Sequence, residues 1–147
     1  MKDLKDTVAW ITGAGTGIGE GAAVAMAREG AKVILTGRRL DPLEQVSKKI
    51  EDAGGFVEIA QGDAMDRPGM MALAKDIQNR YGKLDLLFNN HGINITNRNW
   101  GGGNLEGWDE VIDVNVKGAY NCALAALEVM RPQGEGTIIT TSSKAGV

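Results

Sequence analysis

Apolar residues along this chain follow two alternating patterns, short continuous runs and longer segments in which they recur every three to four positions. The short runs are rich in β-branched residues, which is typical of strands buried on both faces of a sheet. The longer segments have the period of amphipathic helices. Five strands joined by helical crossovers predict an α/β fold with a doubly wound parallel sheet. The runs are 7–12, 32–36, 56–60, 84–88 and 137–141.

The predicted helices between these runs carry recognisable start and stop signals. The segment 18–29 is followed by Gly30, a residue that commonly ends a helix. Asp41 and Pro42 supply an N-cap and a proline at the first position of the second helix. The third helix ends before Gly82. These signals fix where each crossover begins and ends.

The segment 105–130 predicts a long helix with a break or bend near 115–118. Its second half, 119–130, is apolar almost all the way round, which predicts two packed faces and a buried Cys122. One interpretation is a central helix under the sheet. The other is a helix that also contacts a second subunit.

The composition bounds the class of protein. The chain has 147 residues, 43% of them hydrophobic, which predicts one domain over 1–147 and excludes a disordered chain. Sixteen basic against nineteen acidic residues provide no basic field for nucleic acid. No run reaches the roughly 18 apolar residues of a membrane span, and residues 1–6 are too charged for a signal peptide, so we expect a cytoplasmic protein. One cysteine and one histidine exclude a Cys/His zinc cluster, and no metal is expected.

Glycine makes up 21 of the 147 residues, and four of these glycines fall within residues 12–19, between the first strand and the first helix. The segment reads Thr-Gly-Ala-Gly-Thr-Gly-Ile-Gly. Such a turn lets a phosphate approach backbone N–H groups at a helix N-terminus. No Gly-Lys-Ser/Thr follows, which disfavours a P-loop nucleotide triphosphatase. A tight turn without a ligand is the alternative interpretation.

The second strand ends in Thr36-Gly37-Arg38-Arg39, where an acidic residue would hydrogen-bond the ribose 2′-hydroxyl of NAD. Two arginines stand there instead, and guanidinium groups suit a 2′-phosphate. We therefore predict NADP(H) as the preferred cofactor, with NAD(H) as the alternative. The missing acid also counts against a Rossmann-like methyltransferase that uses S-adenosylmethionine. A solvated pair of surface charges is the remaining interpretation.

Three further segments complete a family pattern. Residues 89–92, Asn-Asn-His-Gly, resemble the Asn-Asn-Ala-Gly of the classical short-chain dehydrogenase/reductase family, with His91 in place of alanine. Residues 113–118 resemble the segment that holds the family's active-site asparagine, and 138–146 resemble the strand that delivers its catalytic serine. With the glycine motif, these segments make essentially the whole chain similar to the N-terminal part of that family's Rossmann-type domain.

The resemblance implies hydride transfer between a nicotinamide cofactor and a small carbonyl or alcohol substrate. It implies that Ser143 hydrogen-bonds the substrate carbonyl, with Ser142 as its alternative, and that backbone atoms of Asn115 hold a catalytic water. It also implies a homotetramer in the intact protein. The implied cofactor contacts are Gly13, Thr16, Gly17, Ile18 and Gly19 along the pyrophosphate and ribose, Arg38 and Arg39 at the 2′-phosphate, Asp63 and Ala64 at the adenine, and Asn90 and Gly92 at the nicotinamide ribose.

The family's proton donor is a Tyr-x-x-x-Lys pair, and neither Tyr81 nor Tyr120 is followed by lysine at that spacing. We therefore expect a sheet incomplete on its C-terminal side and a chain that binds cofactor without turnover. A non-catalytic NADP-binding or sensor module is the alternative function. His91 is interpreted as a tolerated substitution or as a contact to substrate or nicotinamide. A Ser-His-Asp hydrolase is disfavoured because Gly-x-Ser-x-Gly is absent.

Overall fold

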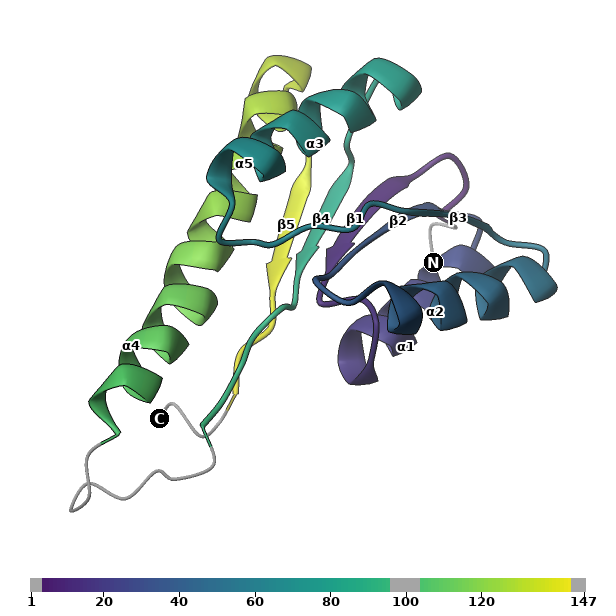
Figure 1. Cartoon of the computed structure of the whole chain (residues 1–147). Coiled ribbons are helices and arrows are strands. Elements are labelled where there is room, and N and C mark those ends of the chain that lie inside the picture. The colour runs from purple at the N-terminus through teal and green to yellow at the C-terminus, as the bar shows by residue number, and fades with distance from the viewer. Residues whose placement is uncertain (1–3, 96–103, 144–147) are drawn as a thin grey trace.

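The computed structural model describes residues 4–95 and 104–143, which form one parallel sheet with helices on both faces (Figure 1). The strand order along the sheet is β3-β2-β1-β4-β5, and every neighbouring pair is parallel. The doubly wound α/β fold predicted from the sequence is therefore confirmed. The strands are β1 (Val8–Thr12), β2 (Lys32–Thr36), β3 (Phe56–Ile59), β4 (Leu86–Asn89) and β5 (Thr137–Thr140).

The fourth strand begins two residues later than the apolar run 84–88 predicts. The N–H of Leu84 donates to Gln133 Oε1 at 3.1 Å. The Gln133 side-chain nitrogen Nε2 donates in turn to the Leu84 carbonyl at 3.1 Å. Leu84 is thus paired with a helix side chain, and its own side chain is fully buried. The Asp85 N–H already donates to the Val8 carbonyl of β1 at 3.0 Å, and the strand register with β1 runs from Leu86 to Phe88.

The helices divide between the two faces of the sheet. Helices α1 (Gly17–Arg28) and α2 (Leu40–Asp52) pack on one face, and α3 (Arg67–Tyr81) and α5 (Ala119–Gln133) pack on the other (Figure 1). Helix α4 (Leu105–Ile112) runs into α5 through the π-helical segment η2 (Asp113–Gly118), which lies at the predicted break. Among the described residues, no helix is both long and apolar enough to cross a membrane.

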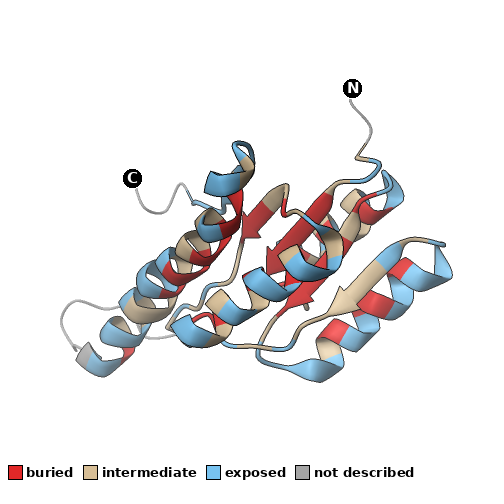
Figure 2. Ribbon diagram, turned by 90° about the horizontal axis from the view of Figure 1, so that it is seen from above, coloured by how far each residue is buried: buried red, intermediate tan, exposed pale blue. Residues whose placement is uncertain are grey.

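The central strands are buried on both sides, as Figure 2 shows. Trp10 of β1 packs with Leu87 and Ile77 under α3 and α5. The next residue, Ile11, points to the opposite face and packs with the residues under α1 and α2, Leu43 among them. Continuous apolar runs follow directly from this burial on two faces.

Helix α5 has one fully packed face within the described residues, whereas the sequence predicted two. Cys122, Ala125 and Val129 are buried in the core beside α3. Tyr120 is 57% exposed on the outer face, and Leu127 is half-buried. Cys122 is a small buried hydrophobe as predicted, and burial raises the pKa of its thiol to about 12.

Candidate functional site

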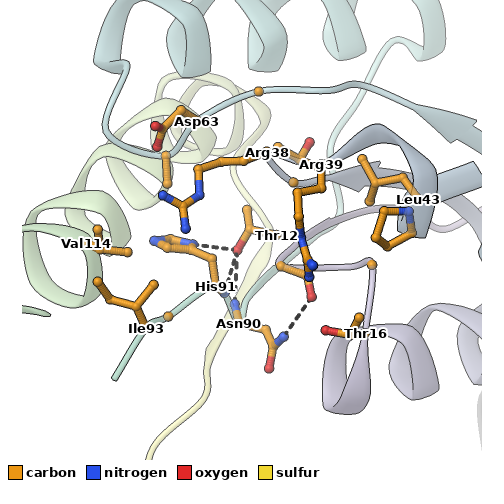
Figure 3. A pocket seen from close by; sticks show the side chains of 18 residues that line it. Thr12, Thr16, Arg38, Arg39, Leu43, Asp63, Asn90, His91, Ile93 and Val114 are labelled. Carbon is orange, nitrogen blue, oxygen red and sulfur yellow. Dashed lines mark hydrogen bonds between the residues drawn. The ribbon is translucent and has the colours of Figure 1, made fainter. Parts of the chain in front are cut away.

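A pocket lies at the carboxyl ends of the strands, where the strand order reverses between β1 and β4 (Figure 3). Ligands of open α/β sheets bind at such a switch point because two neighbouring loops diverge there. Most of the residues predicted to contact a cofactor lie around this one pocket. They are Gly13, Thr16, Arg38, Arg39, Asp63, Ala64, Asn90 and Gly92.

The turn from β1 into α1 needs its glycines for close backbone packing. Gly13 has φ +61°, and a Cβ there would lie 2.7 Å from the His91 Cα. A Cβ on Gly19 would lie 2.2 Å from the Gly13 carbonyl oxygen. The turn is therefore pressed against both its own helix and the loop after β4. Thr16 is the N-cap of α1, and its side chain forms no capping hydrogen bond. Uncapped N–H groups at a helix N-terminus can donate to an anion.

Three predicted cofactor residues are not among those that line the pocket. Gly17, Ile18 and Gly19 form the first turn of α1. Gly19 is buried under the turn, so the structure gives it a packing role. Ile18 is 66% exposed at the start of the helix.

The charged side chains at the pocket come from the ends of β2 and β3. Arg38 and Arg39 are exposed, and neither forms an ion pair within the described part of the chain. The Arg38 carbonyl accepts a hydrogen bond from Gln61 Nε2 at 2.9 Å, which fixes the backbone of this loop. Asp63 accepts from the Met65 N–H at 2.9 Å through Oδ1. Two cations and one anion thus face the same opening.

The Thr12 hydroxyl joins the end of β1 to the loop after β4. It accepts from the N–H groups of Asn90 at 3.0 Å and His91 at 3.3 Å. The Asn90 side chain then donates to the Gly13 carbonyl at 3.3 Å and accepts from the Thr141 hydroxyl at 2.8 Å. These bonds hold the glycine turn, the loop after β4 and the end of β5 in one network.

The two residues predicted for catalysis lie outside the pocket lining. Asn115, in η2, accepts from the Ile93 N–H at 2.8 Å and donates to the Ile93 carbonyl at 2.9 Å. Its side chain therefore satisfies the backbone of the loop after β4. Ser142 and Ser143 are exposed just beyond β5. Residues 144–147, including the rest of the predicted serine motif, lie outside the described residues.

Sequence reasoning missed a buried asparagine whose hydrogen bonds support the loop after β3; we call this asparagine, Asn121, the strut. Asn121 of α5 is 3% exposed, donates to the Ala64 carbonyl at 2.9 Å and accepts from Arg67 Nε at 2.8 Å. The strut fixes the backbone next to Asp63. An asparagine near the start of the largely apolar segment 119–130 was the signal that could have found it. Within residues 4–95 and 104–143, no group of three or more His, Cys, Asp or Glu side chains could hold a metal ion.

Comparisons with known proteins agree with this geometry. Residues 7–147 match the short chain dehydrogenase family. An uncharacterized oxidoreductase of Listeria innocua serovar 6a is 38% identical over 144 residues, which cover 98% of this chain and 58% of that protein.

Two solved structures extend the comparison. A metagenomic short-chain oxidoreductase in complex with NADP is 33% identical, with a TM-score of 0.90 over 99% of this chain and 66% of that one. An NAD⁺-bound xylitol dehydrogenase is 27% identical, with a TM-score of 0.94 over 99% of this chain and 56% of that one. The chain spans less than two thirds of the length of these relatives. The family match over nearly all of its residues shows that the chain belongs to the short-chain dehydrogenase/reductase family.

Proposed function

We propose that the protein is an NADP-dependent oxidoreductase that transfers a hydride between the cofactor and the carbonyl or alcohol carbon of a small molecule. The observation that carries the proposal is the pair Arg38 and Arg39 at the end of β2, in a pocket built at the switch point of the sheet. Family membership favours a nicotinamide dinucleotide over S-adenosylmethionine at this place.

The glycine turn fits the pyrophosphate of a dinucleotide. The turn leaves no room for side chains at Gly13 and Gly19, and the uncapped Thr16 N-terminus of α1 supplies N–H donors. Helix N-termini stabilise anions through these donors and through the helix dipole. In our proposal Gly13, Thr16, Gly17, Ile18 and Gly19 follow the pyrophosphate and its ribose.

The arginines fit the one group that distinguishes NADP from NAD. A 2′-phosphate accepts charge-assisted hydrogen bonds from a guanidinium, whereas the 2′-hydroxyl of NAD is best held by a carboxylate. Arg38 and Arg39 form no ion pair within the described residues, so a phosphate need not displace one. The similar xylitol dehydrogenase structure is bound to NAD⁺, and NAD(H) is therefore the alternative cofactor.

The remaining residues are assigned by their places around the pocket. Asp63 and the Ala64 backbone would hold the adenine, and Asn90 and Gly92 would lie along the nicotinamide ribose. The nicotinamide supplies the hydride when bound. By the family resemblance, Ser143 would hydrogen-bond the substrate oxygen and stabilise charge that develops on it, and backbone atoms of Asn115 would hold a catalytic water.

We also propose that the intact protein is a homo-oligomer, with a tetramer as the expected state. Ile112, Val116 and Tyr120 are 52%, 57% and 57% exposed and recur every four residues along the outer face of α4, η2 and α5. Residues four apart lie on one side of a helix, so the three form an apolar stripe. We propose that a second copy of this chain packs against this stripe.

Replacing Arg38 by alanine tests the cofactor. NADPH and NADH affinities are measured from energy transfer between tryptophan and the reduced nicotinamide. A hydrogen bond to a charged group contributes about 1.5–3 kcal/mol, so NADPH should bind roughly 10- to 150-fold more weakly. NADH should change by less than about threefold, because it has no 2′-phosphate to lose.

Lys49→Ala, a cation on α2 paired with Glu20, is the matched control for a general loss of positive charge. Equal losses of NADPH and NADH on Arg38→Ala would remove the argument for NADP. Binding of neither dinucleotide to the unmodified protein would refute the proposed function. Binding without reduction of any carbonyl fits both the proposed function in this chain, which has no Tyr-x-x-x-Lys pair, and the non-catalytic module.

A further inference from the structure

His91 is the feature of the pocket that the proposed function leaves unexplained. It is the only histidine in the sequence and stands where the family pattern has alanine. Its backbone follows β4, and its ring lies in the pocket wall between Thr12 and the η2 segment (Figure 3). In that view the imidazole extends toward Val114, with the Arg38 side chain beside it.

The hydrogen bonds at Thr12 favour one tautomer of this ring. The Thr12 hydroxyl oxygen already accepts two hydrogen bonds, from the N–H groups of Asn90 and His91. A hydroxyl has two acceptor lone pairs and one proton to donate. The His91 Nδ1 lies 2.8 Å from this oxygen, closer than the Phe88 carbonyl and the Asn89 side-chain oxygen, both at 3.5 Å. The short contact favours donation from the hydroxyl to Nδ1, which then carries no proton.

The other ring nitrogen is enclosed. Nε2 is buried and has no hydrogen-bond partner among the described residues. A Cβ on Gly118 would lie 2.8 Å from Nε2, and 3.2 Å from the Ala64 Cβ. The ring therefore fills the space above a glycine of η2, and neutral imidazole carries its one proton on this nitrogen.

The charged groups that face the ring come from the loops after β2 and β3. Burial is the largest influence and lowers the pKa of His91. A contact to the Val114 backbone of η2, outside hydrogen-bond geometry at Nε2, and the Asp63 carboxylate raise it, and Arg38 lowers it. The net effect is a pKa below the ordinary 6.5, so the neutral ring persists to lower pH than in a free histidine.

We propose that neutral His91 is a positioning residue for the cofactor pocket, holding the loop after β4 against Thr12 so that protonation of the ring weakens dinucleotide binding. The inference rests on the proposed function. An imidazolium would bring a third donor to the Thr12 oxygen, and one of the two N–H bonds that it accepts would have to break. Those bonds fix the loop whose backbone presses on Gly13, so the change reaches the glycine turn directly.

The first test reads the ring itself. In ¹⁵N-histidine-labelled protein, whose His91 signals are identified by their loss in His91→Ala, we expect the Nε2–H tautomer at pH 7.5. We also expect the ring to titrate below pH 6.5, because burial opposes its charge. An Nδ1–H tautomer, or titration at or above the ordinary value, would overturn the inference. This readout needs no cofactor, so it stands apart from the proposed function.

The second test reads binding. NADH is titrated between pH 5 and 8 because it lacks the 2′-phosphate, a group that itself titrates near pH 6. The dissociation constant of the unmodified protein should rise about tenfold for each pH unit below the pKa of His91, while the far-ultraviolet circular dichroism stays constant. His91→Ala, and His91→Gln with its neutral acceptor oxygen, should remove this dependence.

Superimposable pH profiles for the three proteins would overturn the positioning role. Failure of all three to bind dinucleotide at any pH would instead refute the proposed function, and the tautomer measurement would still decide the state of His91. A structural role alone would lower affinity in His91→Ala at every pH, without removing the dependence on acid.

Discussion

Replacing Gly118 by alanine separates backbone preference from side-chain packing at the wall of the pocket. Gly118 has φ −60° and ψ −46°, an ordinary helical conformation that alanine adopts without strain. In a helix interior, alanine is favoured over glycine by about 0.5–1 kcal/mol. Considered by its backbone alone, the substitution should therefore stabilise the protein.

Packing reverses that expectation. The new Cβ would lie 2.8 Å from His91 Nε2, and the ring cannot simply turn away because its Nδ1 is bonded to Thr12 at 2.8 Å. Overpacking of this kind costs about 1–3 kcal/mol. The difference between the two terms leaves a net destabilisation of up to about 2.5 kcal/mol. In a His91→Ala background the contact with Nε2 disappears and only the 3.2 Å approach to the Ala64 Cβ remains, so the same substitution should become neutral or stabilising.

Urea denaturation of the unmodified protein, the two single variants and the double variant measures this coupling. We expect an interaction free energy of about 1–3 kcal/mol, with the sign of the Gly118→Ala effect reversed between backgrounds. Gly21→Ala in α1 is the matched control, because nothing lies within 4 Å of its Cβ position, and it should stabilise both backgrounds equally. Additivity of the two substitutions within about 0.5 kcal/mol would refute the packing of His91 on Gly118.

Two further predictions concern the strut behind the pocket and the outer helix face. Asn121→Leu leaves the buried Ala64 carbonyl and the Arg67 side chain without their partner, so thermal or urea unfolding should show a loss of about 1–3 kcal/mol together with weaker dinucleotide binding. Unchanged stability would show that the strut is dispensable. Val116→Glu places a charge on the exposed apolar stripe and should lower the molar mass measured by light scattering, whereas an unchanged mass would remove this face as the proposed interface.

The sequence by itself determined the fold class and placed the pocket at the edge of the sheet where the strands have their carboxyl ends. The period of the apolar residues distinguishes strands from helices, and helix stop signals such as Gly30 and Gly82 lie next to the elements that they end. Crossover connections then require a parallel sheet and bring the strand ends to one edge. These properties depend on residues close together in the chain, which is why a single sequence contains them.

The contacts that shape the pocket wall were decided by the tertiary structure. Thr12 and His91 are 79 residues apart, and Asn121 and Ala64 are 57 residues apart. Whether such side chains meet depends on how neighbouring strands are registered and how a helix is rotated on the sheet, and neither is set by local periodicity. The same is true of the close packing of Gly19 under Gly13, because only the folded backbone brings the Gly13 carbonyl to 2.2 Å from the Cβ position of Gly19.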